Sequence, residues 1–286
     1  MDVTRDWALN TLAPAFAPFA KRWRDADSPE QSHFIPVRIT RPGSPGEPAQ
    51  GWIHRDLLNT IETALARLEL SFRREASALH LEVRGDKKPP NDLQTLAEHL
   101  RALGLLKGWR GETQAVQASR ENTLMHVERA LFKALGLCSE AVHVHVETHD
   151  GLVWLGVRAD HKAENPGMLD NLCAGGVCNG ETPQATLWRE LQEETGLSAQ
   201  DFEHMAWVYN PNTPLRMNRP LLHGGWHQEW VHVVHAVLKP GVWPRNQDGE
   251  VKAFNLLSRL ACTQQVNDGR LTPDAGLCTA LVLSKQ

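Results

Sequence analysis

The segment from Gly175 to Leu197, GGVCNGETPQATLWRELQEETGL, determines how the rest of the chain is interpreted. It predicts a helix with two defined ends, because Thr182 before Pro183 is a typical N-cap and first-turn pair and Gly196 is a typical C-terminal stop. Apolar residues at helical spacing predict that one face of this helix packs on a sheet; they are Ala185, Trp188 and Leu191.

Acidic side chains crowd the second half of the same helix. Glu190, Glu193 and Glu194 follow Arg189 at spacings that place their carboxylates on one side. Like charges at these spacings repel, and carboxylates in a last turn oppose the helix dipole, each at a cost of about 0.3–1 kcal/mol. One arginine cannot neutralise these glutamates, so the pattern indicates a bound cation. Carboxylate oxygens suit Mg²⁺ or Mn²⁺, which can also bridge to phosphate oxygens.

The glycines before the helix decide between two interpretations. Taken alone, a run such as ELQEE is more often a solvated helix face than a metal site. Glycine-rich backbone beside it, however, allows the main chain to approach a metal-bound diphosphate closely. We therefore expect Gly175 and Gly176 to line the substrate site.

The spacing of the whole segment is specific. It consists of Gly175, five residues, Glu181, seven residues, Arg189-Glu190-Leu191, one residue, Glu193-Glu194, one residue and Gly196-Leu197. This arrangement resembles the signature box of the Nudix hydrolase superfamily at every fixed position. The resemblance implies an α/β fold, with helices on both sides of a mixed sheet in an α/β/α sandwich, and Mg²⁺-dependent hydrolysis of a diphosphate bond in a small organic substrate.

The resemblance also implies roles for individual residues of the box. A backbone carbonyl near Ala174 would be one metal ligand, and the others would be Glu190, Glu193 and Glu194. Arg189 would pair with Glu181 and lock the loop onto the helix. A bidentate pair of this kind suits arginine better than lysine.

Roles outside the box are less determined. The general base is left open between Glu190 and Glu250, because Nudix enzymes draw their base from different loops. Lys162 is a candidate phosphate contact, although a lone lysine before a loop is usually solvent-facing. Glu229 is a candidate substrate contact or second-site metal ligand, and an ordinary strand-end glutamate is an equal alternative. Candidates for stacking on a heterocycle are Trp154, Trp226 and Trp243.

A narrower resemblance covers most of the chain from about Phe34. The run from Lys162 to Gly176, KAENPGMLDNLCAGG, is similar to the segment before the box in the Nudix domain that fungi fuse to thiamine pyrophosphokinase. Further matching stretches are Gly51–Ile53, Trp109–Glu112, Asp248–Val251 and Leu271–Asp274. This subfamily implies hydrolysis of damaged thiamine diphosphates, such as oxo- or oxythiamine diphosphate, to the monophosphate. The stretch Trp230–His235 departs from the tyrosine-rich strand of the relatives, which puts the substrate contacts of that strand in doubt.

Two alternatives stay open beside this hypothesis. One is an ADP-ribose or other nucleoside diphosphate pyrophosphatase, for which Pro211, fifteen residues after Gly196, is weak support. The other is a Nudix-fold regulator that binds a ligand without cleaving it. Such regulators typically lose box glutamates, and here all are present.

Outside the box, the pattern predicts two domains: an α+β accessory domain over residues 1–120 and a Nudix domain over 121–286. The expected elements are a strand at 34–40, helices at 56–70, 92–103 and 121–135, and a hairpin formed by 142–147 and 152–159. Within the hairpin, His143 and His145 alternate with valines. We interpret these histidines as a solvated face rather than as metal ligands.

Composition limits the class of protein. The 286 residues are 41% hydrophobic and 22% charged, with a net charge of −4, which argues against a nucleic-acid surface. Five cysteines without a C-x-x-C pair favour a reducing cytoplasm, and no apolar run is long enough for a membrane span. The expected partner is a small-molecule diphosphate; the sequence does not distinguish a monomer from a homodimer.

Overall fold

The structure is a computed structural model that describes residues 3–25, 33–43, 47–84, 91–120, 122–162, 164–221 and 225–285. The larger of its sheets is built from β1 (Val3–Thr4), β8 (Cys138–Thr148), β9 (Val153–Arg158), β10 (Leu169–Asp170), β11 (Cys173–Gly176), β12 (Phe202–Trp207), β13 (Leu215–Pro220), β14 (Trp226–Leu238) and β15 (Val251–Leu257). The strand order is β1-β13-β14-β8-β9-β10, with β11 on β8, β12 on β14 and β15 on β9. The sheet is mixed, because β14 runs parallel to β8 whereas β9 and β11 run antiparallel to it.

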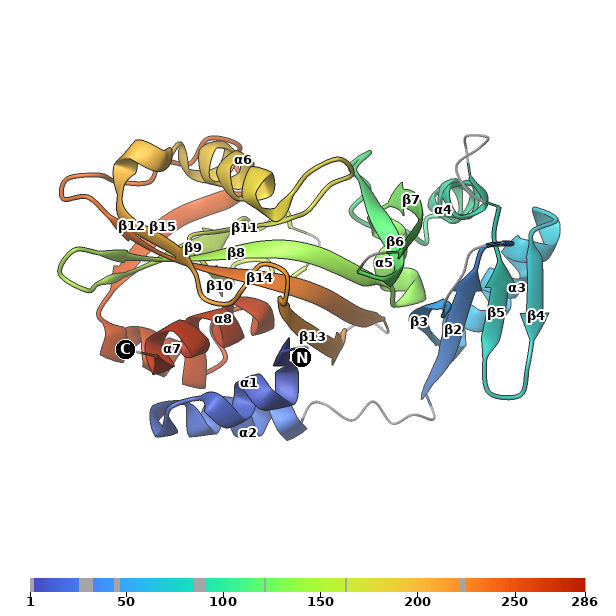
Figure 1. The fold of residues 1–286 in the computed structure, drawn as a ribbon, viewed down its shortest axis with the longest axis horizontal. Coiled ribbons are helices and arrows are strands. Elements are labelled where there is room, and N and C mark those ends of the chain that lie inside the picture. Colours follow the sequence, from blue (N-terminus) through green and yellow to red (C-terminus); the bar gives the residue numbers. More distant parts are fainter. Residues whose placement is uncertain are drawn as a thin grey trace.

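Helices cover both faces of this sheet (Figure 1). One face carries α6 (Pro183–Thr195), and the other carries α7 (Arg259–Asn267) and α8 (Pro273–Ser284), with α1 (Arg5–Thr11) and α2 (Ala17–Asp25) beyond them. Short 3₁₀ turns lie at Pro14–Phe16 and Ala199–Asp201. Each face has its own apolar core, one centred on Leu187 and Leu191 and one on Leu277 and Leu281. The expected α/β/α sandwich is confirmed.

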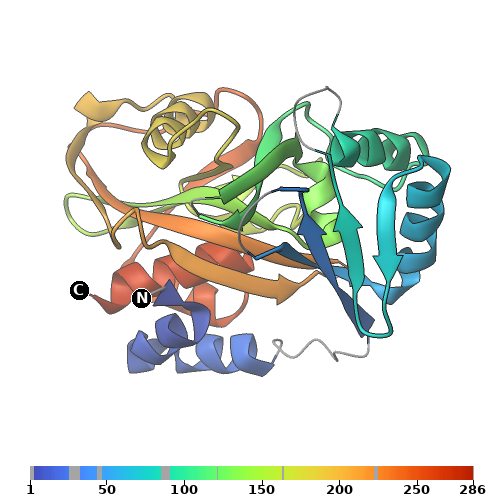
Figure 2. The same ribbon diagram turned by 45° about the vertical axis from the view of Figure 1, so that its right-hand side comes forward.

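A second unit precedes this sandwich, and we call it the accessory unit. It contains β2 (Phe34–Thr40), β3 (Ala49–His54), α3 (Arg55–Arg67), β4 (Ser71–Arg74), β5 (Leu79–Glu82), α4 (Asp92–Ala102), β6 (Thr113–Ser119), β7 (Asn122–Glu128) and α5 (Ala130–Leu135). Its sheet has the order β3-β2-β5-β4, and β6 pairs with β7 separately. A core that runs from Ile35 to Leu137 holds it together. The unit lies at the end of the large sheet where β8 and β14 begin (Figures 1 and 2).

The helix expected at 121–135 is wrong over most of its length. Glu121 lies outside the described residues, and 122–128 form β7, which pairs with β6 from Thr113↔Glu128 to Ser119↔Asn122. Only 130–135 are helical, and Gly136 ends that helix with φ of 57°. The apolar spacing of Leu124, Val127 and Leu131 imitates a helix, but pairing with a neighbouring strand determines the outcome.

The histidines of the expected hairpin are buried, not solvated. The hairpin itself is confirmed, with β8 and β9 paired through Val146↔Trp154. His143 is 6% exposed and His145 is fully buried, because α7 and α8 cover the sheet face that the alternating pattern assigned to water. Alternation therefore correctly predicted a strand but not what covers its second face.

The unit boundaries differ from the expected division at residue 120. Strand β1 pairs in parallel with β13, and Phe16, Phe19 and Trp23 pack in the core beneath the large sheet, so residues 3–25 belong to the sandwich. Conversely, β7 and α5 pack in the accessory core. No helix in the described part of the chain has the length and apolar character needed to cross a membrane.

Candidate active site

The acidic helix begins and ends where local chemistry places it. The Thr182 hydroxyl accepts a hydrogen bond from the Ala185 amide at 3.2 Å, and Gly196 closes α6 in the left-handed conformation with φ of 70°. The buried face is shifted from the expected stripe: Leu191 is buried and Trp188 partly buried, but Ala185 is exposed. Leu187 takes its place in the core, which turns the glutamates toward β11.

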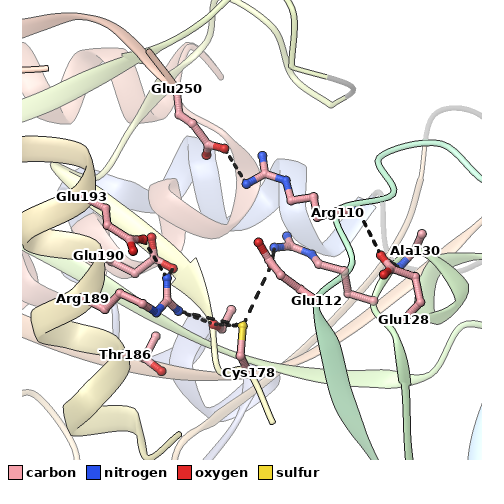
Figure 3. A network of polar contacts seen from close by, with 12 residues as sticks. Arg110, Glu112, Glu128, Ala130, Cys178, Thr186, Arg189, Glu190, Glu193 and Glu250 are labelled. Atoms are coloured by element: carbon pink, nitrogen blue, oxygen red, sulfur yellow. Dashed lines mark hydrogen bonds and ion pairs between the residues drawn. The ribbon is translucent and has the colours of Figure 1, made fainter. Parts of the chain in front are cut away.

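An arginine lock fixes the loop before α6. The Arg189 guanidinium donates to both oxygens of Glu181, with Nε–Oε1 at 2.6 Å and Nη2–Oε2 at 2.9 Å, and also donates to the Gly176 carbonyl at 3.2 Å. Arg189 lowers the pKa of Glu181 to about 2, so this pair stays charged over the physiological range. The pairing of Arg189 with Glu181 that the box predicts is present in the structure, and Arg189 also reaches Glu190 at 2.7 Å (Figure 3).

Two of the box glutamates are removed from water. Burial raises the pKa of Glu190 and, together with the charge of Glu190, raises that of Glu194 well above its usual value. Glu194 is only 6% exposed and accepts a hydrogen bond from the Ala174 amide at 3.3 Å. Glu193 differs, because its side chain is 54% exposed and contacts Arg189 at 3.1 Å. Buried carboxylates without enough neutralising partners are costly unless a cation accompanies them.

Gly175 allows the close approach of strand and helix. A Cβ at this position would overlap the Glu190 carboxylate, so a larger residue would displace that side chain. The neighbouring Gly176 faces the accessory unit instead, where a Cβ would overlap the amide of Gln114. The two glycines therefore serve different contacts, one to the acidic helix and one to the accessory unit.

Glu250 is held by two cations. It forms an ion pair with Lys162. It forms another with Arg110, which belongs to the accessory unit (Figure 3). Burial would raise the pKa of Glu250, but the two cations outweigh burial and leave it below its usual value. Lys162 has the Glu250 carboxylate as its partner and its charge acts on Glu194, and the expected phosphate contact stays a prediction.

A polar cavity adjoins the box. Its wall includes Ala174, Gly175 and Gly176 at one end and Glu229, His227 and Asp274 deeper inside. Four ion pairs contribute side chains to the lining: Arg129–Glu112, Lys133–Glu164, Arg158–Asp170 and Arg219–Asp274. Glu229 accepts from Ser139 Oγ at 2.8 Å. Of the three tryptophans considered for stacking, Trp226 lines the cavity, whereas Trp154 is buried against Trp243.

Sequence reasoning missed the cavity side chains that come from the accessory unit and from α8. Arg129 and Asp274 line the cavity and Arg110 pairs with Glu250 beside the box, although all three lie far from the box in sequence. Two of them fall in the stretches Trp109–Glu112 and Leu271–Asp274, which match the subfamily. The signal was therefore visible in the sequence, but only the fold shows what these residues approach.

Comparison with known proteins agrees with this geometry. A family model described as the NUDIX domain matches residues 139–274. Residues 139–274 are a Nudix domain. Nudix hydrolase 20, chloroplastic, of Arabidopsis thaliana is 30% identical over 179 residues, which are 60% of this chain and 46% of that protein, so the match spans about half the length of the plant relative.

Two more distant matches complete the comparison. The uncharacterized protein YJR142W of Saccharomyces cerevisiae is 24% identical over 245 residues, 79% of this chain and 71% of that protein. The crystal structure of the MutT protein from Methanosarcina mazei Go1 is 16% identical, with a TM-score of 0.38, and the match covers 52% of this chain and 93% of that one.

The Nudix domain has donors that fit a divalent cation. Glu194 is a buried oxygen donor, Glu190 on the same helix is partly buried, and Glu193 lies beside them with its side chain half in solvent. Mg²⁺ and Mn²⁺ take such hard oxygen ligands and retain waters on their open side. The Ala174 amide donates a hydrogen bond to Glu194, so the backbone of Ala174 lies in contact with these glutamates.

Proposed function

We propose that this chain is a Nudix pyrophosphohydrolase that cleaves the diphosphate of a small organic molecule with the help of Mg²⁺. The observation that carries this proposal is the pair formed by Glu194, which is buried, and Glu190, whose side chain is 13% exposed, both held against the glycine strand with pKa values raised by burial. Such a pair destabilises the fold unless a cation binds there. Glu190, Glu193 and Glu194 would hold the ion.

The reaction joins water to one phosphorus and breaks the bond from that phosphorus to the bridging oxygen. The products are an organic monophosphate and inorganic phosphate. A bound Mg²⁺ supplies positive charge to the phosphate oxygens and lowers the pKa of water. The chain contributes positioning: Arg189 and Glu181 keep the loop in place, and Gly175 and Gly176 leave room for the diphosphate.

Two residues remain candidates for the base that accepts the proton of water. Glu190 lies among the ligands, and burial raises its pKa, which favours proton uptake. Glu250 is paired with Lys162 and Arg110, so it can accept a proton only when those cations turn to another anion. Replacement of the true base by glutamine lowers kcat and removes the acid limb of the pH–rate profile. Replacement of the other residue leaves that limb in place.

For the substrate, we propose a damaged thiamine diphosphate, such as oxothiamine diphosphate. The sequence resemblance from Lys162 to Gly176 supports this class, and the cavity chemistry is compatible with it. An aminopyrimidine offers ring nitrogens and an amino group, which suit the Glu229 carboxylate and the ion pairs of the wall. Trp226 provides an aromatic surface at the same cavity.

A phosphate-release screen with Mg²⁺ tests both levels of the proposal. It compares thiamine diphosphate, oxothiamine diphosphate, ADP-ribose and several nucleotides, with Glu194→Gln as the inactive control. Turnover of oxothiamine diphosphate above the others supports the substrate. Turnover of ADP-ribose alone rejects the thiamine assignment but keeps the hydrolase, and binding without any turnover favours the regulator.

A further inference from the structure

The accessory unit reaches the edge of the Nudix box. The Asn179 amide, in the loop of the box, donates to the Thr113 carbonyl at the start of β6 at 2.8 Å. One residue further, Gln114 lies over Gly176, and the Cys178 thiol lies 4.0 Å from the Glu112 carboxylate. Residues 110–114 therefore form one wall of the site (Figure 3).

Arg110 is held rigidly at the front of this wall. Its amide donates to the Glu128 carboxylate at 3.2 Å, and Glu128 is 1% exposed. The Glu128 carboxylate also accepts a hydrogen bond from the Ala130 amide at 3.4 Å. The Glu128 amide in turn donates to the side-chain oxygen of Gln94 at 2.9 Å. The preceding Trp109 ring lies under the Arg101 guanidinium at 4.4 Å. Contacts on both sides thus fix the backbone that carries Arg110.

The guanidinium of Arg110 points across the site to the Nudix domain. Its partner is Glu250, which also pairs with Lys162. The charges of Glu190 and Glu112 act on Arg110 in addition to that of Glu250, and the charge of Lys162 acts on Glu194. Both cations therefore lie within electrostatic reach of the metal-ligand glutamates. Glu250 pairs with both cations, so its single carboxylate is shared between Arg110 and Lys162.

A diphosphate held at the box would meet these two cations. Phosphate oxygens accept charge-assisted hydrogen bonds from arginine and lysine, and arginine can bind two of them at once. The Glu250 carboxylate presents the same two-oxygen geometry to the cations when no substrate is present. We propose that Arg110 of the accessory unit, together with Lys162, binds the diphosphate of the substrate, and that Glu250 is the counter-ion that holds both cations until the substrate binds.

This assignment gives the accessory unit a direct part in the active site, and it rests on the proposed function because the ligand is the diphosphate at the box. It also accounts for the Trp109–Glu112 stretch. Arg110 binds phosphate, Glu112 pairs with Arg129 at 2.7 Å beside the cavity, and Trp109 holds the backbone. When the two cations turn to phosphate, the Glu250 carboxylate is released next to the reacting group.

The test measures binding rather than turnover. The full chain is titrated calorimetrically with methylenediphosphonate, a non-hydrolysable diphosphate, in the presence of Mg²⁺. The variants are Arg110→Gln, Arg110→Lys and Glu250→Gln. The control is Lys252→Gln, which removes the same charge two residues from Glu250, at a lysine that is 54% exposed and pairs with Asp160.

The expected order is distinctive. Arg110→Gln weakens binding about tenfold or more, the usual effect of losing a charge-assisted hydrogen bond, and Arg110→Lys weakens it less. Glu250→Gln leaves binding unchanged or tighter, because no carboxylate competes for the cations. Lys252→Gln changes binding less than about twofold, as an exposed charge does.

Three outcomes overturn the inference. If Arg110→Gln binds methylenediphosphonate as well as the unchanged protein does, the Arg110–Glu250 pair is only a structural contact between the units. Equal weakening by Lys252→Gln shows a general charge effect, and weakening by Glu250→Gln shows that the carboxylate itself holds the site together. If Arg110→Gln does not fold, Arg110→Lys and Glu250→Gln decide. If binding depends on Arg110 but the protein hydrolyses none of the screened substrates, the proposed hydrolase activity is rejected and the inference about Arg110 stands.

Discussion

Glu194 combines a cost to stability with a proposed role in metal binding. Its carboxylate is buried, and the Ala174 amide is the hydrogen-bond donor that it contacts. Glutamine at this position keeps the acceptor and removes the buried charge. We expect Glu194→Gln to raise the free energy of unfolding of the metal-free protein by about 1–2 kcal/mol while activity is lost. Urea denaturation with a chelator measures the first effect, and phosphate release measures the second.

The neighbouring Glu193 provides the matched control. Its side chain is 54% exposed, so Glu193→Gln removes a charge of the same sign from the same helix without a burial cost. The free energy of unfolding of that variant should change by less than about 0.5 kcal/mol. Equal stabilisation by both substitutions would show that helix repulsion, not burial of Glu194, is the cause.

Gly175, in β11, and Gly180, in the loop before α6, require glycine for different reasons. Alanine at Gly175 would displace the Glu190 carboxylate, and a misplacement of about 1 Å can cost on the order of 100-fold in kcat. Gly180 has a φ of 84° and open space around it, so Gly180→Ala should cost about 1 kcal/mol of stability and leave kcat nearly intact. Steady-state kinetics and thermal denaturation of both variants distinguish these effects. Similar kinetics in the two variants would count against a special approach at Gly175.

At the scale of elements, local chemistry predicted α6 and failed for β7. The bounds of α6 follow from Thr182, Pro183 and Gly196, which act within one turn of the chain. Strand β7 depends on β6, with which it pairs, and no residue within β7 records that partner. The arginine lock could be predicted for the same reason as α6. The cavity could not, because its wall combines β8, β14, α8 and the accessory unit.

Helix α7 is fastened to the sheet by a buried acid. Glu147 on β8 is 2% exposed and receives two hydrogen bonds from Arg259 at the start of α7, at 3.1 and 2.9 Å. His235 contacts it at 3.2 Å and His145 at 3.6 Å. Burial would raise the pKa of Glu147, but these partners outweigh it and hold the pKa far below its usual value. Burial also lowers the pKa of His145.

Stability should therefore fall on acidification. A carboxyl with a lowered pKa stabilises the fold above about pH 4.3, its unfolded value, and the contribution disappears as pH falls toward the folded value. A histidine with a lowered pKa adds to the loss below about pH 6.5, where the unfolded chain takes up more protons. The free energy of unfolding should decrease below about pH 6.5 through His145 and more steeply below about pH 4.3 through Glu147, as followed by urea denaturation from pH 7 to about pH 3.

Arg259→Gln tests the cluster. The variant should lose about 1–3 kcal/mol at pH 7, because Glu147 stays buried without the side chain that donates two hydrogen bonds to it, and its further decline below about pH 4.3 should be shallower. Arg73→Gln removes an exposed partner of Glu75 and should lose less than about 0.5 kcal/mol. An unchanged acid slope in Arg259→Gln would mean that other groups govern the pH dependence.

At the scale of the whole molecule, the chain folds back on itself. The sequence indicated an accessory unit and a Nudix unit. It gave no sign that residues 3–25 pack on the Nudix unit, on the face of the large sheet that carries α7 and α8. Short apolar segments carry no information about distant partners, and β1 is only two residues long. The contact of Arg110 with Glu250 is of the same kind, since neither loop shows in its own sequence which residue of the other unit it approaches.

Residues 3–25 should therefore behave as core rather than as a tail. Phe16 is 2% exposed and packs in the core shared with α7 and α8, so Phe16→Ala should lower the free energy of unfolding by about 3–4 kcal/mol. Leu260→Ala, at a side chain that is 81% exposed on α7, should change it by less than about 0.5 kcal/mol. Urea denaturation followed by tryptophan fluorescence measures both. A loss of under about 1 kcal/mol for Phe16→Ala would mean that this segment does not support the sandwich in solution, and β1 with its helices would then be an appendage to a sheet that is stable alone.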